Sequence, residues 1–225
     1  MHIEPGIVDG AKIALSYTTA LGAGAYAIKL AIDAFAKKGF APLLIGTAIC
    51  TLLVFCFFEV LPHYPIGVSE VHFILGATLF LIFGAAPAAF GLALGLLLQG
   101  SLFAPADLPQ YGINVTTLLV PLFLVNSIAS RYIDTNTAYV DLRYRDTLAL
   151  SAAYQGGVIA WVAFWAFYGS GLTVETWNAV SVFGAAYMVV ILVEPVADIA
   201  ILAAAKSLKQ FKETSVFEPR LYNAG

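Results

Sequence analysis

Long apolar runs fill most of the chain, and charged residues, glycines, prolines and turn-forming residues interrupt them. The runs are close to the ~20 residues that a helix needs to cross the hydrocarbon core of a bilayer. They predict transmembrane helices at residues 8–32, 41–61, 67–84, 87–104, 112–132, 147–169 and 178–205. No run alternates between apolar and polar residues, which argues against a transmembrane β-barrel.

The predicted fold class is therefore all-α, a polytopic membrane bundle of about seven transmembrane helices. Residues 1–205 form a single transmembrane domain, with a tight break between the third and fourth helices around residues 84–87. Residues 206–225 form a short, mixed-charge cytoplasmic tail that is either disordered or lies on the inner surface of the membrane.

Composition excludes a water-soluble domain. Of the 225 residues, 60% are hydrophobic and 11% are charged, whereas soluble domains have roughly 45–50% and about 25%. The formal net charge of −3 argues against a nucleic-acid partner, because phosphate binding requires clustered Lys and Arg. The expected surroundings are a lipid bilayer, and the expected location is the cell inner (plasma) membrane.

The distribution of basic residues predicts the orientation. Of the 11 Lys and Arg residues, all but Lys12 and Lys29 fall on one side of the predicted helices. The loops on the other side, 62–66, 105–111 and 170–177, contain no Lys or Arg. Since cytoplasmic loops carry the excess of basic residues, the C-terminus is expected in the cytoplasm and the N-terminus outside.

The N-terminus and the three histidines share that outer side. Residues 1–10 lack the basic segment and apolar core of a signal peptide, and the bulky His2 disfavours removal of the initiator methionine. We therefore expect a free Met1 amine at the outer face. His2, His63 and His72 are all predicted at the same face, although each could instead make a hydrogen bond in a loop or cap.

An N-terminal Xaa-His dipeptide can chelate a metal through the terminal amine, the amide nitrogen of residue 2 and a ring nitrogen of His2. A second imidazole, from His72 or His63, could complete a square of four nitrogens. Such ligation selects Ni(II) or Cu(II), with Co(II) possible, and does not suit Zn(II), Mg(II) or Ca(II).

Four short segments resemble the CbiM/NikM family, the cobalt- and nickel-binding membrane subunits of energy-coupling-factor transporters. Residues 1–6 (MHIEPG) resemble the family's start, and residues 67–72 (GVSEVH) resemble its Gly-Thr-Ser-x-His element. Leu98–Gln99 ends a Leu-rich run, and residues 112–114 (GIN) resemble the family's Gly-x-Asn. Their order, spacing and helix layout agree over about the first 205 residues, whereas the motifs are confined to the first half.

The resemblance implies that the Met1 amine, the residue-2 amide, His2 and His72 bind Ni(II) or Co(II) as the transported substrate. Gln99 and Asn114 would line the site and hold the N-terminal segment, which would tuck into the bundle from outside. Ser69, Glu70 and His63 are further candidates for residues that line the site or support its ligands. The implied partners are a transmembrane coupling subunit and cytoplasmic ATPases. Whether a small accessory membrane protein is also required is left open by the sequence.

The small residues Ala23 and Ala27 of the first span would offer a close-packing face to the coupling subunit. The alternative is that these two residues pack within this chain.

The family's Thr-Ser pair is replaced by Ser69–Glu70. Glu70 could orient the imidazole of His72, supply a weak oxygen ligand, or be a solvated charge in the first turn of a helix. The Asn-rich stretch expected after residue 114 is also missing. These departures suggest a divergent branch of the family.

Glu194 and Asp198 lie one turn apart in the last predicted helix, on either side of Pro195. A proton or cation relay is one interpretation. The other is a helix kink whose carboxylates meet Lys29, Arg131 or a partner subunit.

The sequence contains no Gly-x-x-x-x-Gly-Lys-Ser/Thr phosphate loop and no common catalytic motif, so we expect a transporter subunit rather than an enzyme. The alternatives are an accessory or structural subunit of a larger membrane complex and a membrane metalloenzyme using Glu194 and Asp198.

Overall fold

The computed structural model describes residues 3–134, 136–208 and 215–223. Within them it contains seven α-helices, six of which are long and apolar enough to cross a membrane. Their bounds are α1 (Ile13–Lys38), α2 (Phe40–Glu59), α3 (Gly76–Phe83), α4 (Ala85–Leu102), α5 (Tyr111–Tyr132), α6 (Tyr144–Ser170) and α7 (Val174–Ser207). Short 3-10 turns are η1 (Gly10–Lys12), η2 (Pro105–Gln110), η3 (Tyr139–Asp141) and η5 (Pro219–Leu221). The all-α membrane bundle is therefore confirmed.

The third predicted span, 67–84, is not one continuous helix. Its first part belongs to an antiparallel hairpin of strands β1 (Tyr64–Ile66) and β2 (Ser69–Val71). Its second part is α3, whose 8 residues extend only about 12 Å and cannot cross a bilayer. A strand pairing begins here because Gly67, at φ 67°, allows a tight reversal of the chain. The predicted break between the third and fourth helices is confirmed, since Gly84 separates α3 from α4.

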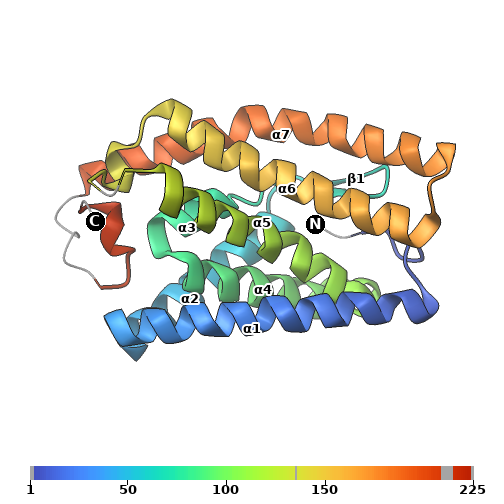
Figure 1. Cartoon of the computed structure of the whole chain (residues 1–225), viewed down its shortest axis with the longest axis horizontal. Helices are drawn as coiled ribbons and strands as arrows, with labels where there is room; N and C mark the ends of the chain where they lie inside the picture. The colour runs from blue at the N-terminus through green and yellow to red at the C-terminus, as the bar shows by residue number, and fades with distance from the viewer. Residues whose placement is uncertain (1–2, 135, 209–214, 224–225) are drawn as a thin grey trace.

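The helices form a bundle in which α1 runs along one side and α6 and α7 along the other, with α3, α4 and α5 between them (Figure 1). Helices α2 and α4 approach each other closely. A Cβ added to Gly91 would lie 2.2 Å from the Cβ of Cys50, and one added to Gly95 would lie 2.6 Å from a methyl of Val54. Because Gly91 and Gly95 have no side chain, the backbone of α4 packs directly against Cys50 and Val54 of α2.

Ala23 and Ala27 of α1 lie in the interior of this bundle. Their exposed fractions are 8% and 4%, and both belong to the main hydrophobic core. The burial favours packing within the chain over a face presented to a coupling subunit. The outward face of α1 carries larger side chains, such as Leu21 and Ile32.

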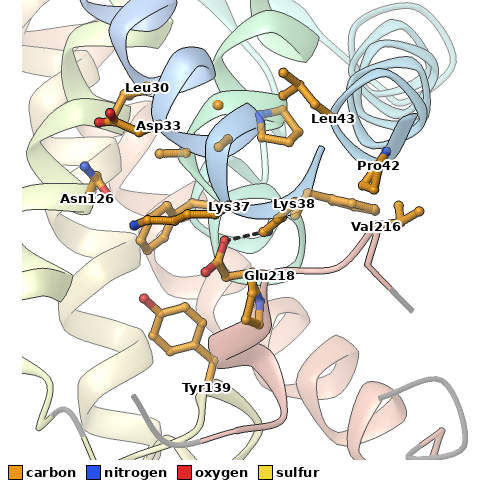
Figure 2. A pocket seen from close by; sticks show the side chains of 18 residues that line it. Leu30, Asp33, Lys37, Lys38, Pro42, Leu43, Asn126, Tyr139, Val216 and Glu218 are labelled. Carbon is orange, nitrogen blue, oxygen red and sulfur yellow. Dashed lines mark hydrogen bonds and ion pairs between the residues drawn. The ribbon is translucent and has the colours of Figure 1, made fainter. Parts of the chain in front are cut away.

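The C-terminal segment, residues 215–223, packs on one end of the bundle, here called the tail end; the end that carries the strands is the hairpin end. Lys38 forms an ion pair with Glu218 at 3.1 Å, and the Glu218 N–H donates to the carbonyl of Ile82 at 2.7 Å. Lys38 and Glu218 border a cavity of about 230 Å³, which Lys37, Asn126 and Tyr139 also line (Figure 2). The described part of the tail is thus an ordered cover on the bundle.

The hairpin turn packs tightly against α7. Replacing its glycine should therefore destabilise the protein more than replacing a glycine with open space around it. A Cβ at Gly67 would lie 2.2 Å from the carbonyl oxygen of Ala179, whereas a Cβ at Gly171, also in the left-handed region at φ 85°, would meet nothing within 4 Å. Gly171→Ala should therefore cost only the conformational strain of about 1–2 kcal/mol. Gly67→Ala should cost more and lower the unfolding temperature of the detergent-solubilised protein further. Equal shifts in the two variants would contradict this packing.

Candidate metal centre

The first described residues lie along the hairpin and join it through an isolated β-bridge; they are here called the N-terminal strand. Ile3, with an exposed fraction of 1%, makes an antiparallel bridge with Ser69. The Glu4 N–H donates to the carbonyl of Val68 at 3.1 Å. Beyond the edge of this small sheet, the Ile3 N–H donates to Oδ1 of Asn114 at 2.9 Å. Backbone and side-chain bonds together therefore fix Ile3 at the buried side of the hairpin.

Met1 and His2, the predicted chelating residues, lie outside the described residues. Of the predicted histidine ligands, the structure describes His63 and His72. Within the described ranges, no group of three or more His, Cys, Asp or Glu side chains could hold a metal ion. The described part of the site therefore contributes at most part of a coordination sphere.

His72 lies directly after β2 rather than within a helix, and its ring is buried. Its Nε2 is 2.9 Å from Oε2 of Glu70. The ring of His63 stacks on it at 5.0 Å between centroids and 12° between planes, and the ring of Phe58 meets it edge-on at 5.0 Å. Contacts with three side chains therefore fix the orientation of the imidazole.

Glu70 is half-buried and lies within a strand, several residues before α3 begins. The interpretation of Glu70 as a solvated charge in the first turn of a helix is therefore wrong, because no helix starts there. Its contact with Nε2 leaves Nδ1 as the ring nitrogen directed away from the carboxylate. A carboxylate that accepts the N–H of a metal-binding imidazole fixes its tautomer and increases its basicity.

Glu70, which contacts this imidazole, belongs to a set of acidic residues around Glu4. Partial burial raises the pKa of Glu4, and the nearby charges of Glu70 and Asp107 raise it further. Glu70 and Asp107 therefore both lie close enough to Glu4 to act on its carboxyl group. An acidic surface of this kind raises the local concentration of cations.

The remaining predicted lining residues divide into two groups. Ser69 and Asn114 both hold the N-terminal strand, as predicted for Asn114 by the resemblance. Gln99 is also buried, but its described hydrogen bond runs to Glu59 of α2 at 3.4 Å. The structure thus brings Ser69, Glu70, His63 and His72 together with the N-terminal strand, and gives Gln99 a role between α2 and α4.

Two residues of α7 that were not predicted as site residues hold the segment after His72. The hydroxyl of Tyr187 is hydrogen-bonded to the backbone of His72. Oε1 of Glu194 accepts the N–H groups of Ile74 at 2.8 Å and Leu75 at 3.1 Å. Glu194 therefore satisfies N–H groups at the start of α3, where a helix has no backbone acceptors of its own.

The interpretation in which Glu194 and Asp198 meet Lys29 or Arg131 is wrong, because the described contacts of both carboxyl groups are with other residues. Oε2 of Glu194 accepts from Gln155 of α6, and Oδ1 of Asp198 accepts from Thr78 of α3. The position of Glu194 next to Pro195 indicated a structural irregularity. Its partner could not be read from the sequence, because it is main chain 120 residues away.

A family model described as "CbiM: Cobalt uptake substrate-specific transmembrane region" matches residues 2–210. A crystal structure of a truncated transition metal transporter is similar to the chain, with a TM-score of 0.74 and 19% identity over 92% of this chain and 99% of that one. A second, of a transition metal transporter, has a TM-score of 0.73 and 20% identity over 93% and 94%. At these identities the likeness establishes the fold. Among curated proteins, none matches the chain significantly.

The bond between Asn114 and Ile3 predicts how the N-terminal strand can be released. Asn114→Leu removes the acceptor of a buried N–H, which should cost about 1–3 kcal/mol and accelerate amide hydrogen exchange in the peptide that contains Ile3. Asn126→Leu is the matched control, because Asn126 lies on the same helix at the tail-end cavity. Exchange that is equally fast in both variants, or unchanged in both, would show that this bond does not hold the strand.

Proposed function

The chain belongs to the CbiM family of cobalt uptake substrate-specific transmembrane regions, and we propose that it captures Co(II) or Ni(II) at the outer face of the membrane for an energy-coupling-factor importer. The family and the transporter fold make it a multi-pass membrane transport protein and not an enzyme. The proposal concerns the metal ligands, the choice between the two metals and the partners.

The observation that carries the proposal is the pairing of Ile3 with Ser69 on the segment that leads to His72. His2 is covalently bonded to Ile3, so an anchored Ile3 limits how far the Met1 amine, the residue-2 amide and the His2 ring can lie from the hairpin. We assign Nδ1 of His72 as the fourth nitrogen ligand, because Glu70 engages Nε2. Four nitrogens suit Ni(II) and Co(II) better than Mg(II) or Ca(II).

Reversible binding would require the described bonds of the N-terminal strand to break together. The strand is joined to the rest of the protein by the bridge to Ser69, the bond from Glu4 to Val68 and the bond to Asn114. A movement of the hairpin relative to α5 would withdraw three proposed ligands together. The chain has no phosphate loop of its own, so a coupling subunit and cytoplasmic ATPases would drive this movement.

An accessory or structural subunit without transport activity is the second candidate, and the contact of Glu70 with His72 favours it. A protonated His72 would form an ion pair with Glu70 that needs no metal. Copurification from the native membrane separates the two functions. An ATPase pair with bound metal supports import, whereas a metal-free chain in another membrane assembly supports the accessory role.

Blocking the N-terminus should abolish metal binding. We expect the protein, tagged only at its C-terminus, to bind one Ni(II) or Co(II) by calorimetry and elemental mass spectrometry. His2→Ala, His72→Ala and a short N-terminal extension should each remove this binding, because each removes proposed ligands. Retention of wild-type affinity by any of the three would disprove the proposed ligand set.

Glu70→Gln should weaken metal binding about 10–100-fold, the usual effect of removing a carboxylate that supports an imidazole ligand. Glu59→Gln is the matched control, since Glu59 is a carboxylate that contacts Gln99. Calorimetric titration of both variants measures the difference. A Glu70→Gln variant with the affinity of Glu59→Gln would exclude the role of Glu70 in supporting the ligand.

A further inference from the structure

A second group of buried polar side chains lies between α3, α6 and α7, on the tail side of His72. Its members all have exposed fractions of 5% or less. They are Thr78 of α3, Thr147, Ser151 and Gln155 of α6, and Glu194 and Asp198 of α7. The three residues of α6 are four positions apart and therefore lie on one face of that helix.

Both carboxyl oxygens of Glu194 have hydrogen-bond donors. It accepts the N–H groups of Ile74 and Leu75 and the side-chain amide of Gln155. Two backbone N–H groups and one side-chain amide therefore meet the two oxygens of this carboxylate. The same contacts also fix the amide of Gln155, because its Nε2 is directed at Glu194.

The acceptors around Asp198 have no such partners. Oδ1 of Asp198 accepts from Thr78, but Oδ2 has no hydrogen-bond partner among the residues that the structure describes. Over the same described ranges, Oε1 of Gln155 and the hydroxyl of Thr147 also lack one. The hydroxyl of Ser151 lies within hydrogen-bonding reach of the Asp198 carboxyl group, and Asp198 is within electrostatic range of Glu194. Buried polar atoms are nearly always satisfied, and unsatisfied ones point to a missing water or ion.

The charge of the group points to a cation rather than to water. Glu194 and Asp198 bring two carboxylates into the interior of a membrane protein, where an uncompensated charge is costly. The described ion pairs all involve other carboxylates. Within this group, the atoms that lack partners among the described residues are all oxygens, and they include one oxygen of a carboxylate.

We propose that Oδ2 of Asp198, Oε1 of Gln155 and the hydroxyl of Ser151 form an intramembrane binding site for a small, hard divalent cation. Such cations, of the Mg(II) and Mn(II) class, take carboxylate, amide and other oxygen ligands. A dication balances the two carboxylates and serves several acceptors at once, whereas one proton on Asp198 could be donated to only one of them. This site requires neither Met1, His2 nor His72 and is independent of the proposed nitrogen site.

A bound cation would connect the two ends of the bundle. It would join α6 to α7 one turn from Glu194, which holds the N–H groups of the segment that follows His72. Thr78 ties α3 to the same carboxylate. Occupancy of the oxygen site would therefore stabilise the junction from which the His72 segment emerges.

Thermal unfolding of the metal-stripped protein in detergent tests the site. We expect Mg(II), which the nitrogen site does not accept, to raise the unfolding temperature by about 3 °C. The shift should be absent in Asp198→Asn and retained in Glu175→Gln, a control on the same helix outside the cluster. No shift in the wild-type protein, or the same shift in Asp198→Asn, would overturn the proposal.

Electron paramagnetic resonance of bound Mn(II) provides a second measurement if Asp198→Asn does not fold. The wild-type protein should bind one Mn(II), and Ser151→Ala, which removes one small ligand, should weaken binding about tenfold. Mn(II) affinity unaffected by Ser151→Ala would overturn the site. His72→Ala should keep the Mg(II) and Mn(II) effects while losing Ni(II) and Co(II), so that the failure of either proposal can be recognised separately.

Discussion

Backbone N–H groups cannot remain unpaired in the interior of a membrane protein, so a chain that leaves a helix there must find other acceptors. The segment between β2 and α3 meets this constraint through Glu194, whose Oε1 accepts the N–H groups of Ile74 and Leu75. Leu75 adopts a φ of 52°, a left-handed conformation that persists only where its surroundings fix it. Without this carboxylate, a continuous helix through residue 72 would be the way to pair these N–H groups. Because it stops, His72 lies on an extended segment at the hairpin end.

The same constraint explains the N-terminal strand. Ile3 is buried, and its N–H is satisfied by a side chain of α5 rather than by the sheet. The backbone carbonyls of α5 are used for hydrogen bonds within the helix, so the acceptor for Ile3 comes from a side chain, that of Asn114. The hairpin and Asn114 therefore act together as a receptor for the first residues of the chain. The position of the proposed metal site thus depends on the hydrogen bonding of these backbone groups.

The sequence predicted most of the fold, because six of the helices follow from uninterrupted apolar runs. It did not predict the hairpin, since residues 67–84 are apolar enough to suggest a span and the interruption depends on Glu194, 120 residues from Ile74. The motifs placed His72, Ser69 and Asn114 in one region, and the structure describes them there. The stacking of His63 on His72 and the bond from Tyr187 to the His72 backbone are tertiary contacts. Periodicity carries no information about such contacts, which is why they could not be derived.

The two polar regions of the bundle differ in the atoms that they offer. Near the hairpin, the described imidazoles supply nitrogen and the carboxylate of Glu70 acts on a ring. Near Asp198, the available atoms are all oxygen. Ligand type separates the metals that prefer nitrogen from hard cations, so the two regions would not compete for one ion. Glu194 stands between them, with one oxygen on the His72 segment and the other on Gln155. A rotation of α7 that broke either set of bonds would therefore be felt by both regions, which makes this helix the natural element through which a partner could change the His72 site.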